Sequence, residues 1–177
     1  MPKSSVEKIE KDDKRIINEL KKNANKSIND IARTCGFSRQ KVWRAIKKME
    51  DNHIIWGYTA LVDEEKFGKK SYMLLIKRSK KPMTKEILDK MSRKDFMKRI
   101  EKLGIESSYH LFINGDYDWI VCFNAADILI AKRYLEELLR TYEGYVSEIR
   151  LQEVMFSAQR CGIINPDIEK IKDFFTF

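Results

Sequence analysis

The sequence has few of the residues that build disulfide frameworks, metal sites or membrane spans. Its 177 residues include three cysteines and two histidines, and the cysteines form no CxxC pair. We therefore expect neither a disulfide framework nor a zinc site. No apolar run approaches the roughly 20 residues of a membrane span, and the polar N-terminus lacks the apolar core of a signal peptide. These absences predict a cytoplasmic protein that does not enter a membrane.

Catalytic motifs are also missing. The sequence has no glycine-rich phosphate loop and no nucleophile elbow, and His53 and His110 lie far apart with no set of metal ligands beside either. We therefore predict no catalytic residue, no metal and no cofactor, and we do not expect an enzyme.

Positive charge is plentiful but unevenly distributed. Thirty-five Lys and Arg face twenty-seven Asp and Glu, for a net charge of +8. Residues 1–60 and 61–100 carry net charges of +6 and +7, whereas residues 101–177 carry −5. Residues 1–100 are thus the part of the chain expected to bind anions. With 43% apolar residues, the chain has enough material for two small cores.

The stretch from Ser27 to Met49 has the pattern of a helix-turn-helix. Apolar residues recur at helical spacing up to Ala32, Gly36 interrupts them, and the same period resumes after Ser38. A small residue at the crossing and a glycine in the turn suit two short helices joined tightly. Ser38 is a plausible N-cap of the second helix.

The second of these helices has an apolar face and an opposite polar face. Val42, Ala45, Ile46 and Met49 share the apolar side at 100° per residue. A solvated charged surface would explain the other side, but an exposed basic helix also suits the major groove, where Arg and Gln pair with base edges and Lys contacts phosphates. Trp43 is expected either to stack on the sugar backbone or to lie across the wing. The predicted DNA-binding residues are Ser38, Arg39, Gln40, Trp43, Arg44, Lys47 and Lys48.

The segments on either side complete a small domain. We expect a first helix from Asp12 to about Asn23, and a short strand pair, or wing, over residues 54–62 with a turn at Gly57. Residues 1–11 form a charged arm that is either disordered or in contact with DNA. Residues 12–68 resemble the N-terminal domain of the Lrp/AsnC (feast/famine) transcription regulators, on the helix-turn-helix and on the Gly-Phe-Ser and Ile-Trp-Gly-Tyr motifs.

The second half of the sequence has a different hydrophobic pattern, in which short apolar runs alternate with segments of helical spacing. Strands are predicted at residues 72–76, 105–113, 119–123 and 146–156, and helices over 87–103, with a second start at Ser92, and 128–138. This βαββαβ order predicts a ferredoxin-like sandwich and an α+β chain whose first domain is a winged helix-turn-helix. We expect domains at 1–62 and 71–157, a linker at 63–70, and a C-terminal extension at 158–177 that includes a short helix packed on a neighbour.

The segment NGDYDWIV, residues 114–121, carries a resemblance to the second domain of the same family. By itself a Gly-Asp sequence between two strands indicates only a hairpin turn. The resemblance implies more: a free amino acid held by this loop at a contact between dimers, with an Asp facing its ammonium. It assigns the candidate effector site to Gly115, Asp116, Asp118 and Ile128.

Assembly is expected on the side of the sheet that no helix covers. The apolar side chains available there are Met73, Leu75, Leu111, Ile113, Ile120 and Cys122. A two-fold dimer would carry two recognition helices about one DNA turn apart and match a palindrome, and the resemblance implies that higher, ring-like assemblies also form.

These observations favour a homo-oligomeric, sequence-specific regulator that binds double-stranded DNA and responds to an amino acid. Two alternatives stay open. One is an architectural DNA-binding protein whose basic 77–102 segment and N-terminal arm wrap DNA with little sequence preference. The other is an enzyme like the siroheme decarboxylases, which are similar in both domains; the GDYDW loop does not match their histidine-containing segment, and His110 is the residue that keeps this alternative open.

Overall fold

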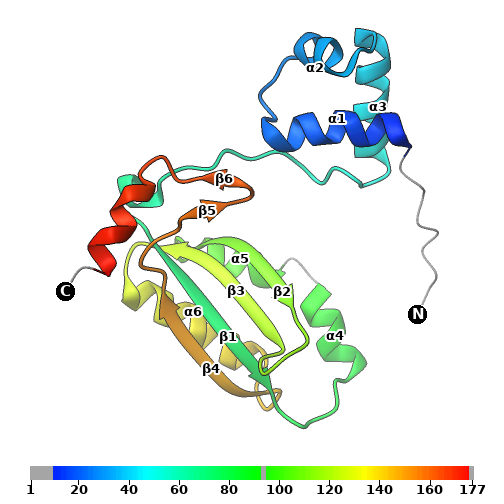
Figure 1. Cartoon of the computed structure of the whole chain (residues 1–177). Coiled ribbons are helices and arrows are strands. Elements are labelled where there is room, and N and C mark those ends of the chain that lie inside the picture. Colours follow the sequence, from blue (N-terminus) through cyan, green and yellow to red (C-terminus); the bar gives the residue numbers. More distant parts are fainter. Residues whose placement is uncertain (1–9, 93–94, 176–177) are drawn as a thin grey trace. The chain divides into compact units, whose positions relative to one another are not determined.

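The computed structural model describes residues 10–92 and 95–175 (Figure 1). They divide into two compact units, one built mainly from the chain up to Leu61 and the other mainly from Val62–Ser157, with the segment Ala158–Lys170 grouped with the first. The arm expected over residues 1–11 lies almost wholly outside the described residues. The domain boundaries at residues 62, 70 and 157 stay predictions.

Three helices form the first unit: α1 (Lys11–Lys22), α2 (Ile28–Cys35) and α3 (Arg39–Asp51). They match the three predicted helices. Each contributes the apolar side that its spacing indicates, and together they enclose one small, mostly aliphatic core. The buried members of this core are Ile16, Leu20, Ile31, Ala32, Cys35, Val42, Ala45 and Met49.

Local hydrogen bonds set the turn between α2 and α3. The Ser27 hydroxyl accepts the N–H of Asp30 at 3.1 Å and caps α2, and the Ser38 hydroxyl accepts the N–H of Lys41 at 3.2 Å and caps α3. Gly36 ends α2 with φ +66°, a conformation that costs a residue with a β-carbon more than it costs glycine. The expected helix-turn-helix and its N-cap are confirmed.

The strand pair expected over residues 54–62 does not form, so that prediction is wrong. The Met49 carbonyl accepts the N–H groups of both Ile54 and Ile55, at 2.8 and 3.1 Å, and His53 turns the chain with φ +56°. Both isoleucines thereby pack against the helical core. The alternation that resembled a strand is explained by this fold-back, and residues 56–62 continue without strand partners.

The second unit is a four-stranded antiparallel sheet with helices, as the βαββαβ pattern predicts. Its strands are β1 (Lys70–Arg78), β2 (Glu106–Phe112), β3 (Trp119–Ala125) and β4 (Val146–Glu153), in the order β2-β3-β1-β4. The helices are α4 (Lys85–Ser92) and α5 (Asp95–Glu101), on either side of residues 93–94, and α6 (Ile128–Thr141). In Figure 1, α5 and α6 lie behind the sheet. The predicted α+β fold class is confirmed.

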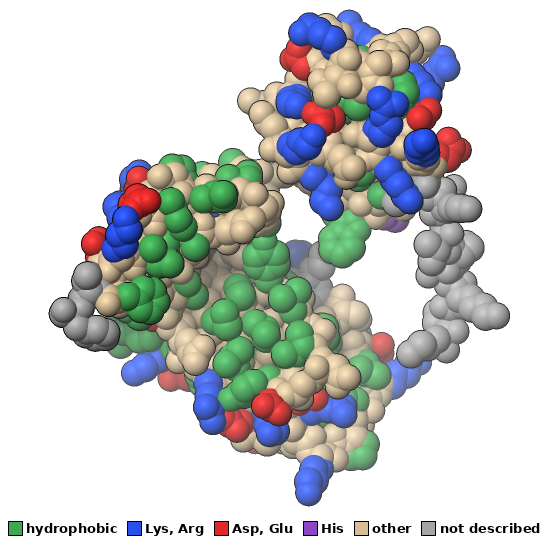
Figure 2. All heavy atoms as spheres, in the orientation of Figure 1, with side chains coloured by type: hydrophobic (Ala, Val, Ile, Leu, Met, Phe, Trp, Pro, Cys, Tyr) green, Lys and Arg blue, Asp and Glu red, His purple; other side chains and the backbone are tan. Residues whose placement is uncertain are grey.

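The sheet has one buried and one open face. Tyr72, Leu74 and Ile76 of β1 alternate into a core that also holds Phe123 and Tyr134, whose rings meet edge to face at 4.8 Å. The opposite positions point away from the helices, and Figure 2 shows hydrophobic side chains gathered over that open face. Its exposed or half-buried members include Met73, Leu75, Leu111, Ile120 and Cys122.

The C-terminal segment differs from the single short helix that was expected. Residues Gln159–Arg160 and Ile163–Ile164 form the two-stranded hairpin β5–β6, in which Cys161 and Gly162 turn the chain at φ +48° and +83°. A 3-10 helix, η2 (Ile168–Phe174), follows. Another, η1 (Glu64–Phe67), lies in the stretch that was predicted to be a linker.

Candidate functional site

The second helix of the helix-turn-helix presents all of its predicted DNA-binding residues to solvent. Val42 and Met49 are fully buried on one side of α3 and fix the orientation of the helix. The opposite side and its flanks are exposed, and Trp43 keeps 54% of its surface accessible. The exposed predicted residues are Ser38, Arg39, Gln40, Trp43, Arg44, Lys47 and Lys48.

The lysines of α3 are already paired with carboxylates. Lys41 meets Asp12 of α1 at 2.5 Å, and Lys48 approaches Asp13 of α1 at 4.0 Å. Lys47 pairs with Asp51 one turn along the same helix at 2.9 Å, and the hydrogen bond to this carboxylate raises the lysine pKa. Lys41 and Lys48 thus face α1. Nothing in the spacing along α3 distinguishes these lysines from the arginines beside them.

The arginines on the first half of α3 are different. Neither Arg39 nor Arg44 makes an ion pair or hydrogen bond with any residue in the described ranges, and the same holds for the Gln40 side chain. Among the described residues nothing occupies their donors, and each guanidinium can form two parallel hydrogen bonds to a guanine edge or a phosphate. Contact of these residues with DNA stays a prediction.

The loop between β2 and β3 is the predicted hairpin connection. The Ile113 N–H donates to the Asp118 carbonyl at 3.0 Å, and the Asp118 N–H donates to the Ile76 carbonyl at 3.0 Å. The Asp118 carboxylate is committed within the chain. One of its oxygens accepts the backbone N–H of Arg78 at 2.9 Å, and the other lies 3.4 Å from the Arg78 Nε.

The four candidate effector residues do not meet within one chain. Gly115 and Asp116 are exposed at the tip of the loop, and Asp118 stands at the start of β3. Ile128 begins α6 after the far end of the same strand and is 41% exposed. A strand of seven residues therefore separates Ile128 from Asp118. An effector site that uses all four residues would have to lie between copies of the chain, and it stays a prediction.

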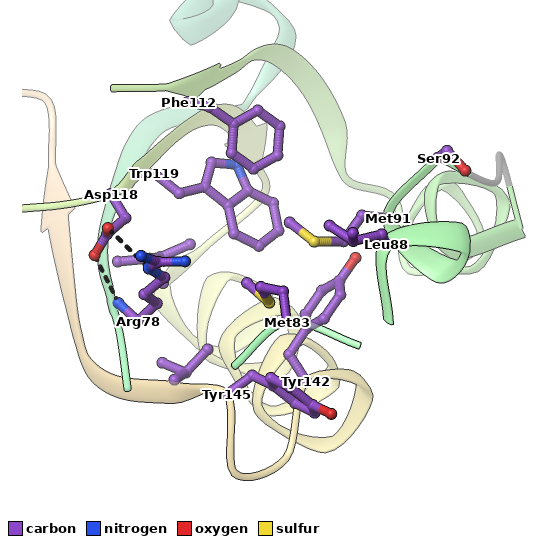
Figure 3. A pocket seen from close by; sticks show the side chains of 12 residues that line it. Arg78, Met83, Leu88, Met91, Ser92, Phe112, Asp118, Trp119, Tyr142 and Tyr145 are labelled. Carbon is purple, nitrogen blue, oxygen red and sulfur yellow. Dashed lines mark hydrogen bonds and ion pairs between the residues drawn. The ribbon is translucent and has the colours of Figure 1, made fainter. Parts of the chain in front are cut away.

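A cavity of about 500 Å³ opens beside Asp118 in the second unit (Figure 3). Side chains from β1, α4, β3 and the segment after α6 line it, and most of them are apolar. Sequence reasoning missed this cavity because its lining comes from residues far apart in the chain. The lining side chains include Arg78, Met83, Leu88, Met91, Trp119 and Tyr142.

His110, the residue on which the enzyme alternative depends, is engaged in the second unit. Its Nε2 lies 2.9 Å from the Ser107 hydroxyl and 3.3 Å from the Tyr134 hydroxyl, and its ring packs beside Trp119. Burial lowers the pKa of this imidazole. Within the described ranges, no three His, Cys, Asp or Glu side chains gather as metal ligands. No helix there has the length and apolar character to cross a bilayer.

Comparison with known proteins agrees with this architecture. Residues 11–55 match a family model described as winged helix-turn-helix DNA-binding. The AsnC family transcriptional regulator from Agrobacterium tumefaciens has a similar structure, with a TM-score of 0.65 and 20% identity over 89% of this chain and 97% of that chain. No curated protein sequence gives a significant match.

Two further solved structures were determined with an amino acid. The feast or famine regulatory protein from M. tuberculosis, complexed with L-methionine, matches with a TM-score of 0.64 and 18% identity over 86% of this chain and 96% of that chain. The transcriptional regulator from Neisseria meningitidis in its L-Met complex matches with 0.63 and 18% over 86% and 94%. At these identities the likeness establishes the fold. The resemblance to the Lrp/AsnC regulators is confirmed at that level.

Proposed function

We propose that this chain is a homo-oligomeric, sequence-specific DNA-binding transcription regulator of the Lrp/AsnC type whose activity depends on a free amino acid. The observation that carries the proposal is the state of Arg39, Gln40 and Arg44. They lie exposed on the first half of a helix whose other face is locked into the core, and no described side chain occupies their donors.

The chemistry of α3 favours recognition of base edges over a purely electrostatic contact. Arg and Gln can form paired hydrogen bonds with guanine and adenine, and each such pair discriminates against a wrong base by roughly 1–3 kcal/mol. The lysines of α3 act differently, because each is paired with a carboxylate that offsets its positive charge. They contribute to affinity through phosphates, and that contribution falls as salt rises.

Assembly through the open face of the sheet would create the two-fold symmetry that a palindromic DNA site requires. The registers place Met73 opposite Cys122, and Leu75 opposite Ile120, so the apolar side chains form rows across the strands. Two such faces packed together would remove these rows from water, as in a sheet-on-sheet sandwich. A dimer of this kind gives each DNA half-site its own recognition helix.

The effector part of the proposal rests on the loop after β2. Gly115 and Asp116 are exposed there and available to a neighbouring copy. The solved relatives described with L-methionine support an amino acid as the ligand class. Because Ile128 is distant within one chain, the proposed site lies at a contact between copies of the protein.

Selection of binding sites from random duplex DNA, with and without a pool of amino acids, tests this function. We expect enrichment of one palindromic sequence and a change in affinity or footprint length when amino acids are present. Uniform recovery of unrelated sequences would instead favour the architectural alternative, in which the basic residues 77–102 follow the DNA backbone. An enriched sequence whose affinity and footprint do not change with amino acids would remove the effector part alone.

A further inference from the structure

The cavity in the second unit has the size and character of a site for a small organic molecule. Its volume of about 500 Å³ lies within the usual range for ligand pockets, roughly 300–1,000 Å³. Met83 and two residues of α4, Leu88 and Met91, face the Trp119 indole across it (Figure 3). Trp119 is itself held by Tyr142, whose ring meets it edge to face at 5.4 Å.

One positive charge projects into this apolar space. Arg78 lines the cavity at the end of β1, just after the register of the β1–β4 pairing shifts between Lys77 and Arg78. Asp118 fixes it through the Nε contact at 3.4 Å and through the bond to its backbone N–H at 2.9 Å. In Figure 3 the carboxylate stands on one side of the guanidinium, and the cavity lies on the other.

This arrangement leaves the ends of the guanidinium free for a ligand. Asp118 uses the Nε, and no other described residue pairs with the Arg78 side chain. The terminal NH₂ groups of an arginine present N–H donors in a planar fork that matches a carboxylate. Met83 and Met91 are flexible apolar side chains that can adapt to ligands of different shape.

We propose that this cavity binds a small carboxylic acid with a bulky apolar body, such as an arylalkanoate. The carboxylate takes the free donors of Arg78, and the apolar body lies between Trp119 and the α4 side chains. An amino group on the ligand is disfavoured. Asp118 is the only carboxylate among the described lining residues, and its charge is already paired with the Arg78 guanidinium. An ammonium placed beside this guanidinium would meet a like charge.

The site shares Asp118 with the candidate effector residues, but Gly115, Asp116 and Ile128 do not line it. It is complete within one chain and does not require DNA binding or assembly. The proposed ligand, a carboxylic acid with an apolar body, is distinct from the free amino acid of the proposed function. The two claims can therefore fail separately.

Calorimetric titration of the full-length protein with three matched ligands tests the proposal. The ligands are 3-phenylpropanoate, L-phenylalanine and 3-phenylpropylamine, which share a ring and differ in their charged groups. We expect saturable binding of 3-phenylpropanoate at one site per chain, binding of L-phenylalanine that is weaker by about tenfold or more, and no binding of the amine.

Four variants locate the site. Arg78→Met removes the fork and should weaken 3-phenylpropanoate binding by about tenfold or more. Leu88→Trp fills the cavity and should abolish binding while Arg78 stays in place. Arg140→Met is the matched control, because Arg140 is an exposed arginine that pairs with Glu137 outside this cavity, and binding should not change. Arg78→Lys, which keeps the charge and loses the fork, serves if Arg78→Met does not fold, and its affinity should also fall.

The opposite results would overturn the proposal. Absence of saturable 3-phenylpropanoate binding, or equal binding to the wild type, Arg78→Lys and Leu88→Trp, would show that this cavity does not take a carboxylic acid. Tighter binding of L-phenylalanine than of 3-phenylpropanoate would show that Asp118 receives an ammonium and that the cavity is an amino-acid site. None of these outcomes depends on whether the protein recognises a DNA sequence.

Discussion

The two units of this molecule differ in the character of their exposed surfaces. The helical unit buries a small aliphatic core and exposes charge, with the basic side of α3 facing water. The sheet unit buries an aromatic core that includes Tyr72, Phe123 and Tyr134, but the open face of its sheet is apolar. A charged exterior suits a polyanion, and an apolar one suits a second protein surface. The difference supports the proposal that the helical unit binds DNA and the sheet unit mediates assembly.

The largest effect is expected from a charge placed on the open sheet face. Ile120→Asp would put a carboxylate in the middle of the proposed interface, where burial without a partner is costly. We expect the oligomer to dissociate, measured by sedimentation velocity at several protein concentrations. Leu129→Asp is the control, because Leu129 is 65% exposed on α6, away from this face. An Ile120→Asp protein with wild-type assembly would show that the face is not the interface.

The next effect concerns the core of the helical unit. Met49 is fully buried among all three helices, and Met49→Ala would leave a cavity there. We expect a loss of about 2–5 kcal/mol in the free energy of unfolding, measured by urea denaturation. The control is Met155→Ala in the other unit, since Met155 is 65% exposed and should change stability by less than about 0.5 kcal/mol. Equal losses for the two variants would contradict the assigned core.

A smaller loss is expected at the cap of α3. Ser38→Ala removes the hydroxyl that accepts the Lys41 N–H and should cost about 1 kcal/mol in the same denaturation experiment. Ser38→Asn keeps a side-chain oxygen in the cap and should retain most of the stability. If the two variants were equally destabilised, the hydroxyl would not act as a cap.

The smallest effect depends on pH and belongs to α1. Glu19 accepts hydrogen bonds from Lys22 and Lys26, both at 2.6 Å, which lower its pKa from 4.5 to about 2. A carboxyl whose pKa is lower in the folded state stabilises it above the unfolded pKa, and this contribution disappears as pH falls from 4.5 towards 2.

Thermal melting of Glu19→Gln and wild type between neutral pH and acid checks this expectation. The wild type should melt higher at pH 7, and the difference should close in the acid range. Glu143→Gln, at an exposed glutamate of the other unit, should show no such closing difference. A gap that stays constant with pH would mean that the two lysines do not stabilise the Glu19 carboxylate.

Features that depend on neighbours in the chain were predictable from the sequence, and features that depend on the assembled fold were not. The cap at Ser38, the turn at Gly36 and the alternation of β1 follow from local spacing, and all three appear in the structure. The wing failed because alternation at Ile54 and Ile55 describes residues that fold back on Met49 equally well. Spacing alone does not reveal which partner will accept a backbone N–H.

The candidate sites divide in the same way. The predicted DNA-binding residues lie on or at the start of one short helix, so their common exposure could be predicted from its period. The cavity could not be predicted, because Arg78, Leu88 and Trp119 come from three different elements. The pairing of Asp118 with Arg78 is also a tertiary contact, and it gives that aspartate a partner that its loop sequence does not indicate.

The central claim is that Arg39, Gln40 and Arg44 recognise a DNA sequence. The most direct test titrates two fluorescent duplexes, one with the selected site and one with a scrambled site. Each is titrated with the wild type and with the triple variant Arg39→Ala/Gln40→Ala/Arg44→Ala. Arg33→Ala is the control, because Arg33 is an exposed arginine of α2 paired with Asp30 at 3.5 Å. We predict that the triple variant loses the preference for the selected site, by about tenfold or more, while the control keeps it. A triple variant that discriminates between the two duplexes as well as the wild type does would contradict the account.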